Sequence, residues 1–160
     1  MASDRARERN GVEILIAEDS ATQAEQLKYL LEQEGYTVRA AANGRLALAA
    51  ARKHKPMLIV SDVVMPEMDG YALCKAVKAD PQLRDVPVII LTTLSSIQDI
   101  AMGLECGADN FLRKPYDPKG LLARIDNLLS NWELRQNNKM RMGLEIYLGG
   151  KKHFITSERE

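Results

Sequence analysis

The stretch that decides the fold runs from Met57 to Gly70 and reads MLIVSDVVMPEMDG. Its first five residues are mostly apolar, as in a strand buried on both faces of a sheet, and Asp62 directly follows them. Three other apolar runs also end in polar side chains: 12–17 before Glu18 and Asp19, 88–91 before Thr92, and 108–113 before Lys114 and Pro115. Carboxylates, a hydroxyl and an ammonium are groups suited to handling a phosphoryl group and a divalent cation.

Strand and helix patterns alternate five times along the chain. We expect strands at 12–17, 36–41, 57–61, 86–91 and 108–113, and helices at 20–34, 43–54, 71–79, 97–106 and 117–131. The inward face of the fourth helix is predicted to consist of Ile97, Ile100, Ala101 and Leu104. Short loops between strand and helix predict an α/β fold, a parallel sheet with helices on both faces. Ligands of such folds bind at the carboxyl ends of the strands, so the polar strand ends should converge on one rim.

Composition excludes several classes of function. The 160 residues carry 22 basic and 22 acidic side chains, so the net charge offers no electrostatic footprint for nucleic acid or for an anionic membrane. Apolar runs are too short to span a bilayer, and Met1–Asn10 is charged, unlike a secretory signal. We therefore expect a cytoplasmic protein. Cys74 and Cys106 have no CxxC spacing, which favours two unrelated buried thiols over a disulfide or metal pair.

The chain resembles the receiver domain of two-component response regulators from about Val12 to Leu129. The resemblance rests on a set of motifs in a fixed order: Glu18-Asp19, Asp62 with Met65-Pro66 and Asp69-Gly70, Thr92, and Lys114-Pro115. Thr92 follows Asp62 by 30 residues and Lys114 follows it by 52, separations that agree with the family. The resemblance implies a flavodoxin-like, doubly wound, five-stranded parallel sheet of order 2-1-3-4-5 with five helices and a C-terminal extension. It also implies a cis Lys114-Pro115 bond.

The resemblance further implies a phosphorelay site centred on Asp62, the phosphoacceptor. The phosphoryl group would come from a histidine kinase, a phosphotransfer protein or a small phosphodonor. A magnesium or manganese ion would be held by Glu18, Asp19, Asp62 and the backbone carbonyl of Val64. Lys114 would neutralise the phosphoryl oxygens as a point charge, and Thr92 would donate its hydroxyl to one of them. Thr93 would serve as well by composition, and only the spacing selects Thr92.

A switch and a timer are the next implications of the resemblance. Movement of Thr92 toward the phosphoryl group would let Phe111 turn inward and repack the surface of the fourth helix, fifth strand and fifth helix. The other reading of Phe111 is a plain core aromatic. Val64 and Leu94, two residues after Asp62 and Thr92, are apolar and are expected to slow hydrolysis of the acyl phosphate. A homodimer would use the same surface or the C-terminal linker.

The expected organisation is a flexible N-terminal segment at 1–11, a receiver domain at 12–130 and a C-terminal linker at 131–160. The chain stops on Ser157-Glu158-Arg159-Glu160, a capping-box pattern that starts a helix, so we expect a fragment of a longer multidomain protein. One alternative is a receiver-like docking or dimerisation module that is not phosphorylated. An aspartyl phosphatase is disfavoured because Val64 occupies the place of its general-acid aspartate. The cognate kinase, input signal and output domain are not encoded here.

Overall fold

The computed structural model describes residues 11–93 and 97–131, and its centre is one parallel sheet of five strands. The strands are β1 (Glu13–Ala17), β2 (Thr37–Ala41), β3 (Leu58–Asp62), β4 (Val88–Thr92) and β5 (Asn110–Arg113), in the order β2-β1-β3-β4-β5. The helices are α2 (Ala21–Gln33), α3 (Gly44–Lys53), α4 (Gly70–Ala79), α5 (Ile97–Glu105) and a last helix over residues 118–131. The predicted flavodoxin-like, doubly wound fold is confirmed.

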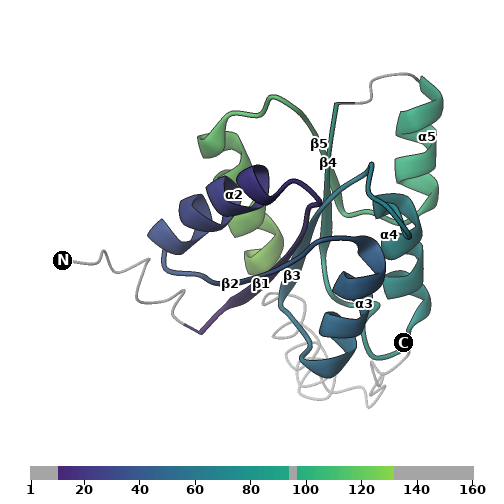
Figure 1. The fold of residues 1–160 in the computed structure, drawn as a ribbon, viewed down its shortest axis with the longest axis horizontal. Helices are drawn as coiled ribbons and strands as arrows, with labels where there is room; N and C mark the ends of the chain where they lie inside the picture. Colours follow the sequence, from purple (N-terminus) through teal and green to yellow (C-terminus); the bar gives the residue numbers. More distant parts are fainter. Residues whose placement is uncertain (1–10, 94–96, 132–160) are drawn as a thin grey trace, which may run out of the picture. The chain divides into compact units, whose positions relative to one another are not determined.

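The chain divides into two compact units after Ile125, and the sheet lies in the first. Within that unit, α2 and the start of the last helix cover one face of the sheet, and α3, α4 and α5 cover the other (Figure 1). The second unit begins at Asp126, and its described part is the end of the last helix. The predicted N-terminal segment up to residue 10 and the predicted linker after residue 131 lie outside the described residues.

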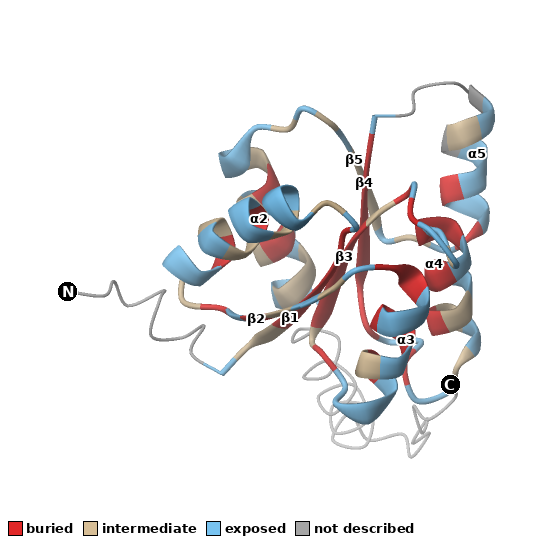
Figure 2. Ribbon diagram, viewed as in Figure 1, coloured by how far each residue is buried: buried red, intermediate tan, exposed pale blue. Residues whose placement is uncertain are grey.

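The three central strands are buried on both faces because their sequences are almost continuously apolar (Figure 2). β3 pairs in parallel with β1 on one side and with β4 on the other. Asp62 is the last residue of β3 and lies beside Leu91 of β4, so it is part of the strand rather than the first residue after it. This register brings the carboxyl ends of the central strands together at one rim.

The helices α2, α3 and α4 begin with side-chain caps. Ser20 accepts the Gln23 N–H at the start of α2, and Asn43 accepts the Leu46 N–H at the start of α3. Asp69 accepts the Ala72 N–H at the start of α4. Each cap satisfies a backbone donor that the first helical turn leaves open.

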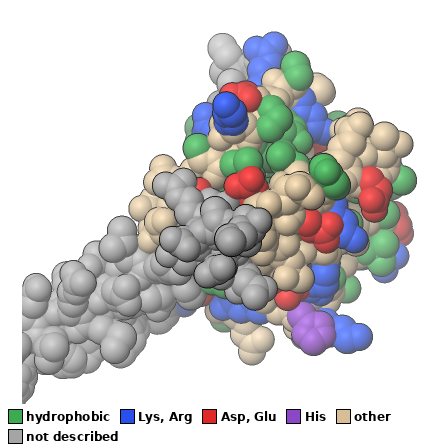
Figure 3. Space-filling model, turned by 90° about the vertical axis from the view of Figure 1, so that its left-hand side faces the viewer, with side chains coloured by type: hydrophobic (Ala, Val, Ile, Leu, Met, Phe, Trp, Pro, Cys, Tyr) green, Lys and Arg blue, Asp and Glu red, His purple; other side chains and the backbone are tan. Residues whose placement is uncertain are grey.

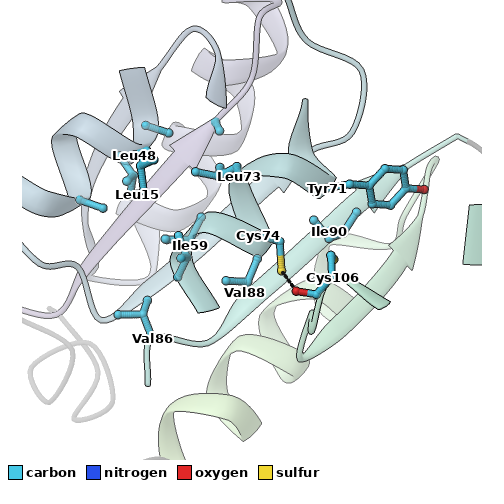
Figure 4. Packing of buried hydrophobic residues seen from close by; sticks show 14 of the residues in the cluster. Leu15, Leu48, Ile59, Tyr71, Leu73, Cys74, Val86, Val88, Ile90 and Cys106 are labelled. Carbon is cyan, nitrogen blue, oxygen red and sulfur yellow. Dashed lines mark hydrogen bonds between the residues drawn. The ribbon is translucent and has the colours of Figure 1, made fainter. Parts of the chain in front are cut away.

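The core between the sheet and its α3–α4 face consists of buried, mostly apolar side chains (Figure 4). Leu15, Ile59 and Ile90 from the sheet meet Leu73 of α4, all of them fully buried. Each such side chain contributes roughly 1.5–3 kcal/mol by leaving water. This apolar layer packs against the strands whose carboxyl ends form the rim.

The two cysteines are free and buried, as predicted, but they are not unrelated. The Cys74 thiol on α4 donates to the carbonyl oxygen of Cys106 at 3.3 Å, a contact drawn in Figure 4. A side-chain hydrogen bond with Cys106, followed by burial, raises the pKa of the Cys74 thiol. The pair therefore joins α4 to the end of α5 without a covalent bond.

The predicted inward face of α5 is wrong for two of its residues. Ala101 is exposed and Leu104 is 74% exposed, whereas Gly103 is buried. The reason is Phe111 of β5, whose ring lies against Gly103: a Cβ at position 103 would be 2.1 Å from Cε2 of Phe111. The helix therefore presents its glycine to the aromatic ring. The side chains of Ile97 and Ile100 lie outside the described set.

Candidate functional site

Three carboxylates meet at the rim, at the ends of β1 and β3. Each of Glu18, Asp19 and Asp62 offers an oxygen, and these oxygens all lie within 4.8 Å of one another. Glu18 is buried, Asp62 is half-buried and Asp19 is exposed. The sequence prediction that these residues share one place is borne out by these distances. Grouped carboxylate oxygens that remain open to solvent on one side suit a hard divalent cation.

Lys114 lies over this cluster and contacts acceptors from three different elements. Its Nζ is 3.2 Å from Oδ2 of Asp62, 3.3 Å from Oε2 of Glu18 and 2.9 Å from Oε1 of Gln23. These contacts match the three donors of an ammonium group. The backbone N–H of Lys114 donates to the Thr92 carbonyl at 2.7 Å. The peptide bond between Lys114 and Pro115 is cis, as the resemblance implied.

Gln23 is the residue that the sequence reasoning missed. It lies in the first turn of α2, four residues after Asp19, and its amide oxygen reaches the ammonium of Lys114. The only available signal was this spacing, since the first turn of the helix after β1 must pass close to the rim. A glutamine there is ordinary on a solvent-facing helix, so composition gave no reason to select it.

The site has an excess of negative charge. Burial raises the pKa of Glu18, and the Asp62 carboxylate raises it further, although the Ser20 N–H and Lys114 act in the opposite direction. Burial by itself lowers the pKa of Lys114, but the carboxylates of Asp62 and Glu18 outweigh burial and the net change is upward. Lys114 is therefore charged at neutral pH. Three carboxylates face one ammonium, so the donor set fits a divalent cation.

The backbone around Asp62 is fixed by close contacts. The Val63 N–H donates to Oδ1 of Asp62 at 2.7 Å, and the Ser61 hydroxyl donates to the Asp62 carbonyl at 2.8 Å. Gly70, at the start of α4, lies so close that a Cβ there would be 2.1 Å from the Asp62 carbonyl oxygen. Its N–H donates to the Val63 carbonyl at 2.8 Å. The carboxylate therefore projects from a rigid base.

The remaining predicted site residues lie around this centre. Thr92 ends β4 and is buried, whereas Thr93 is exposed. Val64, two residues after the end of the strand that carries Asp62, is 65% exposed. Phe111 is half-buried and packs against both the core and Gly103. Leu94 lies outside the described residues.

A groove of about 660 Å³ opens beside Lys114. Its walls come from α2 and from the segment after β5, and they include Gln23, Leu27, Leu30, Lys114, Pro115 and Tyr116. Burial raises the pKa of the Tyr116 hydroxyl, so Tyr116 remains neutral at the edge of this groove. On the face drawn in Figure 3, acidic and basic side chains are interspersed.

The sequence and the fold are those of a known family. Residues 14–126 match the response regulator receiver domain family, and the chain belongs to it. The predicted resemblance is thereby confirmed.

Two curated relatives are longer proteins that contain a segment similar to this chain. The chain is 38% identical over 155 residues to histidine kinase P4 of Formosa agariphila, covering 97% of this chain and 11% of that protein. It is also 38% identical over 116 residues to the DNA-binding dual master transcriptional regulator RpaA of Synechocystis, covering 72% of this chain and 48% of the relative. The chain thus spans about half, or much less, of the curated relatives it matches.

Solved structures agree with this assignment. A signal receiver domain of a histidine kinase from Syntrophus aciditrophicus superposes with a TM-score of 0.73 at 51% identity, covering 76% of this chain and 92% of that one. The chemotaxis protein CheY4 of Vibrio cholerae superposes with a TM-score of 0.69 at 36% identity, covering 73% and 98%. Among the described residues, no helix is long and apolar enough to cross a bilayer.

Proposed function

We propose that this chain is a phosphorylatable receiver in which Asp62 accepts a phosphoryl group from a phosphohistidine or from a small phosphodonor. The observation that carries the proposal is the contact of one ammonium, that of Lys114, with both Asp62 and Glu18 at the end of the sheet. A lysine that only stabilised the fold would need one carboxylate partner, whereas here a cluster of three carboxylates, partly open to solvent, lies beside one ammonium. The family assignment supports the same function.

The chemistry follows from where each oxygen of Asp62 is held. One carboxylate oxygen forms the new bond to phosphorus while the bond from phosphorus to the donor's nitrogen or oxygen breaks; a departing imidazole takes up a proton, whereas acetate leaves acetyl phosphate as its anion. The Val63 N–H fixes the orientation of the carboxylate. The Lys114 ammonium, already beside the Asp62 carboxylate, would neutralise the negative charge that the phosphoryl oxygens bring to this place.

Glu18, Asp19, Asp62 and the Val64 carbonyl would hold the metal ion. Magnesium or manganese, when bound, neutralises charge so that an anionic nucleophile can approach an anionic phosphoryl group. The Val63 carbonyl accepts the Gly70 N–H, and the next carbonyl along the chain, that of Val64, is the ligand that the family resemblance implies. Oxygen ligands with room for several waters are the set that magnesium prefers.

Phosphorylation would be read out through Thr92 and Phe111. Thr92 would donate its hydroxyl to a phosphoryl oxygen, and the ring of Phe111 would change its position against Gly103. The surface of α5, β5 and the helix that begins at residue 118 would then repack, as a two-state element biased by the modification. A homodimer through this surface or the linker belongs to the same proposal, with a histidine kinase or phosphotransfer protein as the phosphodonor.

Intact-mass spectrometry after incubation with acetyl phosphate and Mg²⁺ tests the proposal. The wild-type chain gains the mass of one phosphate, Asp62→Asn does not, and a control at an exposed helix carboxylate, Glu25→Gln, behaves as wild type. If the wild-type chain gains no phosphate from acetyl phosphate or from a histidine kinase, it is a docking module instead. A gain that persists in Asp62→Asn places the phosphoacceptor elsewhere.

A further inference from the structure

The segment 63–69, here called the β3–α4 loop, is attached to the first turn of α3 by contacts that metal ligation does not explain. The Gly44 N–H donates to the Met68 carbonyl at 3.0 Å. Nδ2 of Asn43 donates to Oε2 of Glu67 at 3.0 Å, and Arg45 pairs with the other oxygen of Glu67 at 3.3 Å. These contacts come from α3 and its cap, which follow β2 and carry none of the three clustered carboxylates.

The attachment of the β3–α4 loop to α3 depends on the residue types at positions 43, 44 and 67. Glu67 has φ of 66°, a left-handed conformation that costs a residue with a Cβ roughly 1–2 kcal/mol. Gly44 has no room for a side chain, because a Cβ there would be 2.5 Å from the Met68 carbonyl oxygen. Asn43 is buried and uses both ends of its amide, since Oδ1 caps α3 and Nδ2 holds Glu67. The surrounding contacts offset the unfavourable φ.

The loop carries the Val64 carbonyl between two anchors. On one side the Gly70 N–H fixes Val63, directly after Asp62. On the other side α3 fixes Glu67 and Met68. Val64 itself is 65% exposed, so side-chain packing does little to position its backbone. The direction of its carbonyl therefore depends on the anchors.

We propose that Asn43 and Glu67 are positioning residues that hold the Val64 carbonyl toward the acidic cluster and so set the affinity of the site for a divalent cation. This inference rests on the proposed function. It predicts that a contact between α3 and the loop changes metal affinity even when no charge near the cluster is altered.

Asn43→Ser is the deciding variant. Serine retains a good helix cap, but its hydroxyl is one bond shorter than the Asn43 amide nitrogen and does not reach the place from which Nδ2 donates to Glu67, and the net charge is unchanged. We expect the dissociation constant for Mg²⁺, measured by calorimetric titration of the full chain, to rise roughly three- to tenfold, the effect of one hydrogen bond. Glu67→Gly accepts the left-handed backbone while losing both side-chain contacts, and should weaken binding similarly.

Matched variants separate positioning from charge and from stability. Glu67→Gln removes the charge but retains an acceptor for Asn43, so it should bind Mg²⁺ within about twofold of wild type. Arg45→Met removes only the exposed ion pair and should do the same. Because the two residues share one contact, the double variant Asn43→Ser with Glu67→Gly should be no weaker than the weaker single variant.

The outcomes distinguish this inference from the proposed function. If Asn43→Ser lowers the urea midpoint of unfolding but leaves the Mg²⁺ affinity unchanged, the contact is only structural and the inference fails. Equal weakening by Glu67→Gln and Glu67→Gly would show that the charge of Glu67 acts through space, which also overturns it. A wild-type chain that neither binds Mg²⁺ nor takes up phosphate refutes the proposed function itself.

Discussion

Replacing Gly70 by alanine tests how closely the phosphoacceptor strand and α4 are packed. The new Cβ would be 2.1 Å from the carbonyl oxygen of Asp62 and 3.0 Å from the Cα of Val63, and both obstacles are backbone atoms that cannot rotate away. Overpacking of this kind costs about 1–3 kcal/mol, and the absence of a flexible neighbour favours the upper end. Alanine regains up to about 1 kcal/mol of helix propensity. The net loss is about 2 kcal/mol.

A loss of this size lowers Tm by roughly 5–10 °C in a domain of this length. The displaced strand end also moves the Asp62 carboxylate, and a shift near 1 Å costs on the order of 100-fold in rate. Urea unfolding followed by circular dichroism measures the first effect, and the rate of phosphate gain from acetyl phosphate measures the second.

Gly120→Ala is the matched control for this prediction. Gly120 lies in the last helix, and a Cβ there meets only Cβ of Asp117 at 3.8 Å, an ordinary contact. This variant should gain about 0.5–1 kcal/mol of stability from helix propensity and keep the wild-type rate. If Gly70→Ala is as stable as wild type and as quickly phosphorylated, the packing argument for the site is refuted.

Three further changes give expected outcomes. Val64→Asn should speed loss of the acyl phosphate in a dephosphorylation assay, because an amide admits water where an apolar side chain hinders it; an unchanged or slower loss contradicts this role. Gln23→Met removes one of three acceptors of the Lys114 ammonium and should slow phosphorylation about three- to tenfold with little change in the urea midpoint; an unchanged rate would show that Gln23 does not position Lys114. Burial, and then Asp99, raises the pKa of Tyr71 above its ordinary value of 10.0. The unfolded chain therefore loses the Tyr71 proton at a lower pH than the folded chain does, so the stability of the wild type falls as the pH rises above 10.0. The difference in urea stability between the wild type and Tyr71→Phe should shrink over the same pH range. A difference that stays constant would refute this effect of Tyr71.

The sequence patterns were sufficient for the alternation of strands and helices and for placing the carboxylates at one rim, because both depend on local patterns, whereas the strand order came from the family resemblance. An apolar run fixes each strand, and a parallel sheet brings the strand ends to one rim, so Glu18 and Asp62 had to lie close. The cis bond before Pro115 came from the family resemblance, since the base rate of cis X-Pro bonds is only about 5–6%.

Contacts between elements could not be predicted in this way. The outward position of Leu104 follows from the ring of Phe111, which competes for the same space from another element. The hydrogen bond from Asn43 to Glu67 joins residues 24 positions apart, each ordinary in its local setting. Periodicity reports how one helix or strand divides its surface, and it carries no information on which partner fills the space.

Locating the phosphoryl group on the chain tests the central claim most directly. Borohydride reduces an acyl phosphate on aspartate to homoserine, and peptide mapping by mass spectrometry then identifies the converted residue. After phosphorylation in Mg²⁺, we expect homoserine at position 62 and wild-type aspartate at position 19. Homoserine at any other position, or phosphorylated protein that yields none, would contradict the assignment of Asp62 as the acceptor.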